Sequence, residues 1–225
     1  MKSNKDFDSV FRLLEKNQSK TYLDIASKTY AYTPFQILIS TVLSQRTKDI
    51  QTDRAAKKLF KRFKTAKQLA KANTREIQEL IKQAGFYKVK AKRIKEIAKK
   101  LIENHKGRVP ENETNLLSLP GVGHKTAACV LIYAFNIPAI AVDTHVHSIS
   151  NRFGWVKTKT PEQTRKKLIE LIPKKHWLKL NDLLVRHGQT TCLARKPKCF
   201  SCKINSYCNY FDKIIQKHPK KETNK

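Results

Sequence analysis

Apolar residues recur at helical spacing along almost the whole chain, whereas the strict alternation of a β-strand is scarce. In the segment 91–102, alanine, isoleucine and leucine occupy one face of the predicted helix, and lysine and arginine occupy the other. Thr33 before Pro34 and Thr160 before Pro161 are typical of helix starts, because threonine caps free N–H groups and proline suits the first turn. We therefore predict an all-α protein.

Further signals predict where helices begin and end. Asn73 followed by Glu76 has the spacing of a capping box, in which each side chain bonds the backbone of the other residue. Gly107 and Pro110 follow a long amphipathic stretch and predict its end. The segment 216–225 is basic and has little apolar surface to pack, so we expect a disordered tail there.

The chain carries a large excess of positive charge. Its 225 residues include 47 lysines and arginines against 18 aspartates and glutamates, which gives a formal net charge of +29. Such a field attracts polyanions, although in a lysine-rich protein it also serves solubility alone. No segment approaches the roughly 20 apolar residues that cross a bilayer, and the N-terminus lacks an apolar signal-peptide block. We expect a soluble, cytoplasmic protein without a membrane partner, whose cysteines are reduced or metal-bound.

The stretch LPGVGHKTAACVL has the form of two helices joined by a tight glycine turn. We expect a short helix that ends over 115–118, a turn over 119–123 and a second helix over 124–135. Gly121 and Gly123 allow backbone angles closed to other residues and let a ligand approach closely. The free N–H groups at the start of the second helix suit a phosphate oxygen. An ordinary helix connection is the alternative, and the basic composition favours nucleic-acid binding.

Four cysteines lie within 17 residues near the C-terminal end, in the pattern C-x6-C-x2-C-x5-C. In a chain without secretion signals this spacing indicates metal binding rather than disulfides. Zinc and iron–sulfur clusters both accept four thiolates, but zinc more often uses two separated C-x2-C pairs, and this run has one. Cys129 stands apart on an apolar helix face, where a small core residue is expected. The four clustered residues are Cys192, Cys199, Cys202 and Cys208.

Several stretches together resemble the endonuclease III family of DNA glycosylases. The glycine-turn stretch is followed by AIAVDTHV, and the cysteine run reads CLARKPKCFSCKINSYC. LSQRTKD at 43–49 and AGFYKVKAKRI at 84–94 also match, so the resemblance covers about residues 7–210. It implies an all-α fold of two helical domains with a DNA-binding cleft between them. One domain would carry the helix-hairpin-helix motif and the other the cysteine-cluster loop.

The resemblance also implies domain bounds and a function. We expect a central helical domain over 21–135, and a cluster-bearing domain formed by 1–20 together with 136–215. The implied protein is a monomeric base-excision repair enzyme, a bifunctional DNA N-glycosylase and abasic-site lyase for oxidised pyrimidines in double-stranded DNA. A monofunctional mismatch or adenine glycosylase is one alternative, although such relatives usually lack a lysine at Lys125. A non-catalytic DNA-binding module is the other.

Two residues would carry the chemistry that the resemblance implies. Lys125 would attack C1′ of the damaged nucleotide, displace the base and form a Schiff base that permits β-elimination. The attacking amine must be neutral, and a helix N-terminus, partial burial and neighbouring cations all favour that form. Asp143 would stabilise the positive charge that develops on the sugar and accept protons from Lys125. Asp143 also suits a helix N-cap, and both roles are compatible.

Further side chains would bind the cofactor and the DNA. The resemblance implies a [4Fe–4S] cluster on the four cysteines, with zinc as the alternative, and a mainly structural role in shaping the cationic loop 193–198. Base extrusion leaves a gap that Gln45 or Arg46 would fill, and Phe86 would act as a wedge unless it is a core aromatic. His124 would contact phosphate or cap its helix. The expected DNA-contacting residues are Leu119, Gly121, Val122, Gly123, Gln45, Arg46, Phe86 and His145.

Overall fold

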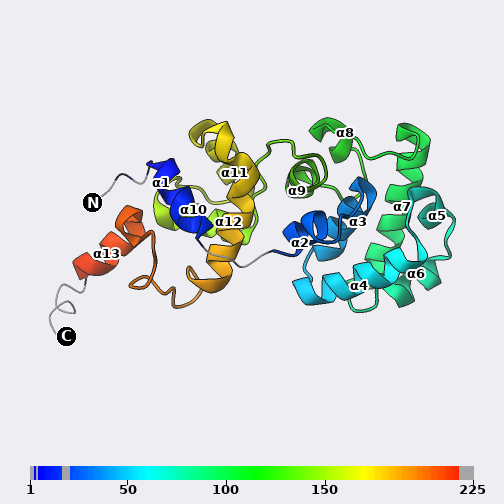
Figure 1. Cartoon of the computed structure of the whole chain (residues 1–225), viewed down its shortest axis with the longest axis horizontal. Coiled ribbons are helices and arrows are strands. Elements are labelled where there is room, and N and C mark those ends of the chain that lie inside the picture. Colours follow the sequence, from blue (N-terminus) through cyan, green and yellow to red (C-terminus); the bar gives the residue numbers. More distant parts are fainter. Residues whose placement is uncertain (1–2, 4, 17–20, 218–225) are drawn as a thin grey trace. The chain divides into compact units, whose positions relative to one another are not determined.

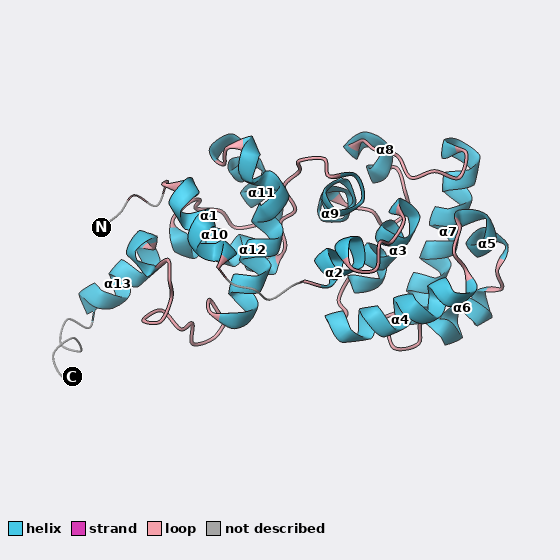
Figure 2. Cartoon of the chain, viewed as in Figure 1, coloured by secondary structure: helices cyan, strands magenta, loops and turns pink. Residues whose placement is uncertain are grey.

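The computed structural model describes residues 3, 5–16 and 21–217, and every regular element among them is a helix (Figures 1 and 2). The all-α prediction is therefore confirmed. In this described part of the chain no helix combines the length and the apolar character needed to cross a bilayer. The chain divides into two compact units, Lys20–Ala139 and Met1–Ser19 with Ile140–Lys225.

The helices fall into these units as follows. The unit Lys20–Ala139 contains α2 (Tyr22–Lys28), α3 (Pro34–Ser44), α4 (Asp49–Arg62), α5 (Ala66–Lys71), α6 (Thr74–Leu80), α7 (Tyr87–His105), α8 (Glu113–Leu117) and α9 (His124–Phe135). The other unit contains α1 (Phe7–Glu15), α10 (Thr144–Phe153), α11 (Pro161–Leu171), the short 3₁₀ helix η1 (Lys174–His176), α12 (Trp177–Thr190), the 3₁₀ helix η2 (Asn205–Tyr207) and α13 (Asn209–Lys217).

The helix α3 forms the centre of the unit Lys20–Ala139. Its start is fixed by the predicted Thr33–Pro34 pair, and Gln36 completes a capping box with Thr33. All its residues from Ile37 to Leu43 are buried, and full burial of one such isoleucine or leucine contributes roughly 1.5–3 kcal/mol. It packs against α9, α4 and α7 (Figure 1). The loop that follows α3 and the first turn of α9 are therefore attached to the best-packed part of the unit.

The helices α6 and α7 show where the sequence signals were right and where they were not. Asn73 caps α6 by accepting a bond from the Arg75 N–H at 2.8 Å. The predicted capping box is wrong, because Asn73 bonds the N–H of Arg75 rather than that of Glu76, and the Glu76 carboxylate accepts a bond from Arg62 of α4 at 2.9 Å. The end of α7 follows the prediction, since Gly107 has a φ of 78° just after the last turn.

The second unit is built around an aromatic cluster. Phe7 and Phe11 of α1 lie against Trp155, with ring centroids 5.6 and 6.3 Å apart. The N-terminal helix also packs on α12, and Lys175 lies 2.7 Å from the Asp8 carboxylate. Of the predicted disordered tail, Gln216 and residue 217 belong to α13, whereas 218–225 lie outside the described residues.

Candidate functional site

The glycine turn joins two helices at the predicted positions. α8 ends at Leu117, and α9 begins at His124 and ends at Phe135. Gly121 has a φ of 69°, which favours glycine, as expected. The same expectation is wrong for Gly123, because its φ of −98° is open to any residue. Nothing lies within 4 Å of a Cβ built on Gly123, so its side of the turn is open.

The remaining predicted turn residues anchor the motif from inside. Leu119 and Val122 are buried, with 3% and 6% of their surfaces exposed. The Val122 N–H donates to the Leu119 carbonyl oxygen at 3.1 Å, which closes the turn. A ligand at this turn therefore meets the backbone of these two residues rather than their side chains.

Lys125 is the second residue of α9. Its predicted place at a helix N-terminus is confirmed, but the expected partial burial is wrong for the protein alone, since Lys125 is exposed. No side chain in the described part of the chain caps this helix, so the first N–H groups of α9 and the Lys125 ammonium lie on one accessible surface. The neighbouring His124 uses its Nδ1 to bond Glu113 of α8 at 2.8 Å.

A second charged group near Lys125 was missed by the sequence analysis. Asp49 is the first residue of α4. The pKa of its carboxyl is raised overall, because partial loss of hydration outweighs the bond from the Tyr22 backbone and the positive charge of Lys125, which both lower it. A carboxylate within the electrostatic range of Lys125 thus comes from the same structural unit. No local motif marks this residue, because its relation to Lys125 depends on how α4 and α9 each pack on α3.

Asp143 is the N-cap of α10. Its Oδ1 accepts a bond from the Val146 N–H at 2.8 Å, which confirms the capping role. The residue is partly exposed, and the preceding strap of chain is buried from Ile140 to Val142. Asn181 of α12 holds this strap by donating to the Ala141 carbonyl oxygen at 3.1 Å. The position of the Asp143 carboxylate is therefore fixed from both sides.

The two candidates for insertion into DNA differ in their contacts. The Gln45 side-chain amide donates to the Gly121 carbonyl oxygen and to Thr126 Oγ1, both at 3.2 Å. The side chain of Gln45 is thus bound to the glycine turn. Arg46 is exposed and has a φ of 51°, and its guanidinium carbon lies 5.9 Å from the centre of the Phe86 ring. The Arg46 side chain is therefore exposed beside Phe86, whereas the Gln45 side chain is bonded within the protein.

Phe86 directly precedes α7 and has a φ of 59°. It is 63% exposed, so the alternative of a core aromatic is wrong. Val89, one turn further on, is 54% exposed. These two residues line a surface depression together with Arg46 and Arg93. An exposed aromatic ring beside two guanidinium groups is suited to stacking on a base and binding phosphate.

Lys90 is a functional candidate that sequence reasoning missed. Only 3% of its surface is exposed, and burial together with the charge of Arg93 lowers the pKa of Lys90 to about 8. Its ammonium donates to the carbonyl oxygens of Leu43 and Gln45 at 2.7 and 2.5 Å. The sequence contained a signal for this residue. Lys90 lies one turn before Ile94, so it is a lysine on the apolar face of the predicted helix.

Arg93 makes a close approach to the glycine turn. A Cβ built on Gly121 would lie 2.3 Å from Arg93 Nε. Gly121 is therefore favoured by its backbone angle, and a Cβ there would in addition displace the end of the Arg93 side chain. The sequence predicted the unusual backbone angle of Gly121 but not its contact with Arg93.

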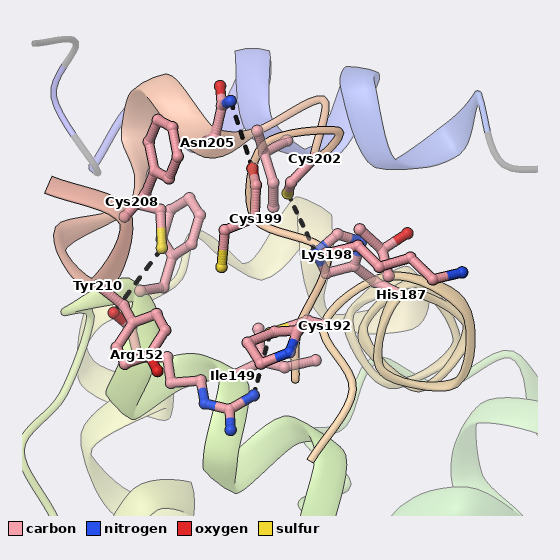
Figure 3. Close-up of a pocket in the computed structure, with 15 residues that line it drawn as sticks. Ile149, Arg152, His187, Cys192, Lys198, Cys199, Cys202, Asn205, Cys208 and Tyr210 are labelled. Carbon is pink, nitrogen blue, oxygen red and sulfur yellow. Dashed lines mark hydrogen bonds between the residues drawn. The ribbon is translucent and has the colours of Figure 1, made fainter. Parts of the chain in front are cut away.

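The four clustered cysteines line one pocket in the second unit, with Arg152 and His187 among the other lining residues (Figure 3). Figure 3 shows their sulfur atoms around a shared space. Within the described residues, no three His, Cys, Asp or Glu side chains could hold a single metal ion. The predicted grouping of Cys192, Cys199, Cys202 and Cys208 in space is thus present.

The environment of these thiols fits a positively charged group. Burial raises the pKa of Cys202 to about 11 and also raises the pKa values of Cys199 and Cys208. Thiolates in such a pocket need a bound cation, because burial alone disfavours the charged form. His187, 3.6 Å from Cys202 Sγ, does not supply that charge, since burial lowers the pKa of His187 to about 4. Four thiols are the donors that an iron–sulfur cluster uses, whereas in this structure the described side chains do not gather around a single ion such as zinc.

Arg152 joins the cysteine pocket to the cationic loop 193–198. Its guanidinium donates to the carbonyl oxygens of Leu193 and Ala194, both at 2.8 Å, and lies 3.5 Å from Cys192 Sγ. The start of the loop is thus fixed to α10 by a planar group with several donors.

His145, a predicted DNA contact, lies on the first turn of α10 and is partly buried. A Cβ built on Gly188 of α12 would lie 2.3 Å from His145 Nδ1. Its ring therefore packs closely on α12, where Gly188 leaves room for it.

Comparisons with known proteins agree with this arrangement. The family model for HhH-GPD superfamily base excision DNA repair protein matches residues 39–174. Endonuclease III of Thermotoga maritima is 49% identical over 178 residues, 79% of this chain and 84% of that protein. Endonuclease III of Escherichia coli is 36% identical over 215 residues, 95% of this chain and 99% of that protein.

A solved structure is also similar. The structure of a trapped endonuclease III–DNA covalent intermediate, an estranged-adenine complex, has a TM-score of 0.78 and 30% identity, and the match covers 96% of this chain and 100% of that chain. The identities and the coverage point to one assignment. The chain belongs to the endonuclease III family, within the HhH-GPD superfamily of base-excision DNA repair proteins.

Proposed function

We propose that this chain is a base-excision repair enzyme, a bifunctional DNA N-glycosylase and abasic-site lyase that acts on oxidised pyrimidines in duplex DNA. Relatives named endonuclease III match almost the full chain. One observation carries the lyase half of the proposal. Lys125 stands at the start of α9, directly after the glycine turn, in a chain similar to an endonuclease III that was trapped covalently on DNA.

The chemistry begins with a neutral Lys125 amine. Its nitrogen attacks C1′ of the damaged nucleotide, and the bond from C1′ to the base breaks with the electron pair leaving on the base. One amine proton passes to Asp143, and the sugar ring opens as its O4′ takes up a proton, which leaves a protonated Schiff base between Lys125 and C1′. Removal of a C2′ proton then expels the 3′ phosphate by β-elimination. Asp143 stabilises the positive charge that builds on the sugar and accepts a proton from the lysine.

The DNA is held first through its backbone. The glycine turn offers the Gly123 N–H and the uncapped N–H groups of α9 to a phosphate, whereas the N–H groups of Leu119 and Val122 are bonded within the motif and shape the turn. The net charge of +29 adds an electrostatic attraction, so we expect binding to weaken steeply with added salt. His145 is proposed as a further DNA contact beside Asp143.

Arg46 and Phe86 are proposed to enter the helix where the damaged nucleotide leaves it. Both are exposed, and Arg46 lies over the Phe86 ring. The Gln45 side chain is bonded to the turn instead, so we assign it to positioning. Between the two candidates that the sequence left open, these contacts favour Arg46 for insertion.

We propose that Cys192, Cys199, Cys202 and Cys208 hold a [4Fe–4S] cluster, with a structural role for the loop 193–198. The shared pocket of the four thiols supports this proposal, and bound iron would supply the charge that buried thiolates require. Zinc is the alternative. Elemental analysis distinguishes the two, since iron and sulfide in equal amounts support the cluster and zinc without iron contradicts it.

Borohydride trapping tests the central proposal. Purified protein is incubated with a duplex that contains thymine glycol or an abasic site, and the Schiff base is reduced to a stable adduct. We expect an adduct with the natural chain and with the control Lys99→Ala, an exposed lysine of α7, but none with Lys125→Ala. Excision without an adduct in the natural chain would favour a monofunctional glycosylase, and binding without excision would favour a non-catalytic module.

The organisation of the enzyme completes the proposal. We infer that the two compact units correspond to the two predicted domains, and that the protein is a monomer acting on DNA inside the cell. Light scattering during size-exclusion chromatography tests the monomer, and a mass of twice 26.0 kDa would contradict it.

A further inference from the structure

Two separate loops of the unit Lys20–Ala139 each contain a residue with an unusual backbone angle. Arg46, after α3, has a φ of 51°, and Phe86, before α7, has a φ of 59°. Side chains with a Cβ rarely adopt this conformation, and it persists only where the surrounding structure holds it. Something must therefore fix both loops in the protein before any DNA is bound.

The Lys90 ammonium is such a fixing point. It has three N–H donors and three acceptors, the carbonyl oxygens of Leu43 and Gln45 and the Thr47 hydroxyl, at 2.7, 2.5 and 2.7 Å. The residue is 3% exposed. No donor is left for a phosphate, so Lys90 does not belong to the charged surface that faces DNA. All three N–H donors of Lys90 are bonded to the end of α3 and to the loop that carries Arg46.

The Thr47 hydroxyl extends this contact to the second loop. Its Oγ1 accepts bonds from Lys90 and from the Gly85 N–H at 3.1 Å, and it donates to the Gln45 carbonyl oxygen at 3.3 Å. One donor and two acceptors complete the capacity of a hydroxyl. The two loops also touch directly, because a Cβ built on Gly85 would lie 2.8 Å from the Arg46 carbonyl oxygen.

From this network we infer that Lys90 is a positioning residue that locks the Arg46 and Phe86 loops together as one preformed wedge. The inference rests on the proposed glycosylase function and adds a residue and a role to it. Arg46 and Phe86 then enter the DNA as a pair, because neither loop moves without breaking bonds to Lys90 or Thr47. Fixing the loops in advance removes the entropic cost of ordering them on DNA.

The test separates wedge insertion from the chemical step. Lys90→Met keeps the length of the side chain and removes the ammonium, and Thr47→Val keeps the shape and removes the hydroxyl. Lys92→Met is the control, since Lys92 is an exposed lysine on the same helix. Each variant is given a duplex with thymine glycol, and the same duplex with a preformed abasic site, which has no base to unstack. Single-turnover rates are measured, together with the fluorescence of 2-aminopurine opposite the lesion.

We expect Lys90→Met and Thr47→Val to slow thymine glycol excision by roughly tenfold or more, and strand cleavage at the abasic site by less than about threefold. The 2-aminopurine signal of base displacement should fall in parallel. The double variant should be no slower than the slower single variant, because both changes break one network. Lys92→Met should match the natural chain.

Two results would overturn the inference. Unchanged excision in both variants would show that the network does not matter for insertion. Equal slowing on both DNAs would show that Lys90 supports only the fold or the chemistry. A natural chain that neither excises thymine glycol nor forms the borohydride adduct would instead contradict the proposed function, so the two failures are distinguishable.

Discussion

The side-chain amide of Gln45 lies 3.2 Å from the carbonyl oxygen of Gly121, so the loop after α3 is bonded to the tip of the glycine turn. The same amide donates to Thr126 on the first turn of α9. Gln45 therefore links the loop that carries Arg46 to the element that carries Lys125. The Gln45 side chain therefore holds the Arg46 loop at a fixed distance from the glycine turn and the start of α9.

Substitution of Gln45 should mainly lower stability, whereas substitution of Arg46 should mainly slow excision. We expect Gln45→Ala to lower the free energy of unfolding by about 0.5–1.5 kcal/mol, because two hydrogen bonds are lost. Arg46→Ala should change it by less than about 0.5 kcal/mol, as is usual for an exposed residue, but slow excision by roughly tenfold, or about 1.4 kcal/mol of activation free energy. Urea unfolding and single-turnover excision measure the two effects. The reverse pattern would assign insertion to Gln45.

Asp143 allows its capping role to be separated from its proposed chemical role. Asparagine caps helices about as well as aspartate, so Asp143→Asn should leave thermal unfolding nearly unchanged. Loss of the negative charge should slow excision by roughly 10²–10³-fold. Asp143→Ala should show the same slow excision and, in addition, lose about 1 kcal/mol of stability with the cap. Full activity of Asp143→Asn would remove Asp143 from the mechanism.

The two glycines of the turn should respond differently to alanine. Gly121→Ala should lose roughly 1–2 kcal/mol of stability, because the left-handed angle disfavours a Cβ and Arg93 must also move. Gly123 has an ordinary φ and open space around it, so Gly123→Ala should change stability by less than about 1 kcal/mol, because the lower entropy of the unfolded chain offsets the poorer N-cap of α9. Its added methyl group should nevertheless weaken duplex binding, measured by fluorescence anisotropy. Unchanged affinity would argue against backbone contact at Gly123.

The buried amine of Lys90 predicts a pH dependence of stability. Its pKa is lowered to about 8 from the ordinary value of 10.5. Between these pH values the unfolded chain keeps a proton that the folded amine has lost, so the free energy of unfolding rises with pH in this window. Below pH 8 both states are protonated, and the cost of burying the charge is fully present.

Comparison with Lys90→Met isolates this contribution from the other lysines. The difference in unfolding free energy, natural chain minus variant, should rise by up to roughly 3 kcal/mol from the lower to the upper end of the window. Urea unfolding across that range provides the measurement. A difference that stays flat or falls with pH would contradict the lowered pKa.

The cysteine pocket offers a matched pair of substitutions. Cys202→Ala removes one of four pocket thiols, whereas Cys129→Ala removes a buried thiol of α9 outside the pocket. We expect Cys202→Ala to lose bound metal and the associated stability, because metal binding and folding of such loops are coupled. Cys129→Ala should keep the full metal content. Equal metal content in both variants would show that the pocket is not the metal site.

Local signals predicted much of the fold. The bounds of α9 and the caps at Thr33, Asn73 and Asp143 were readable, because they depend on residues within one or two turns. The grouping of the four cysteines was readable for the same reason. Glu76 shows the limit of this approach, since a distant Arg62 took the place of its expected local partner.

The missed parts of the candidate site all depend on tertiary contacts. Lys90 finds its acceptors on α3 and its following loop, and Asp49 comes near Lys125 only because α4 and α9 both pack on α3. The exposure of Phe86 was equally invisible, because an aromatic residue before a helix suits either a core or a surface. The position of Lys90 on an otherwise apolar helix face was the one sequence signal for these residues that was not used.

The helix α1 belongs to the unit formed mostly by the C-terminal half of the chain, where it packs on α12. During synthesis the segment Lys20–Ala139 emerges complete and can fold early, as domains commonly do on the ribosome. The first helix, in contrast, has no docking surface until residues 177–190 have been made. The apolar face of α1 therefore stays without its packing partner on the ribosome until α12 has been synthesised.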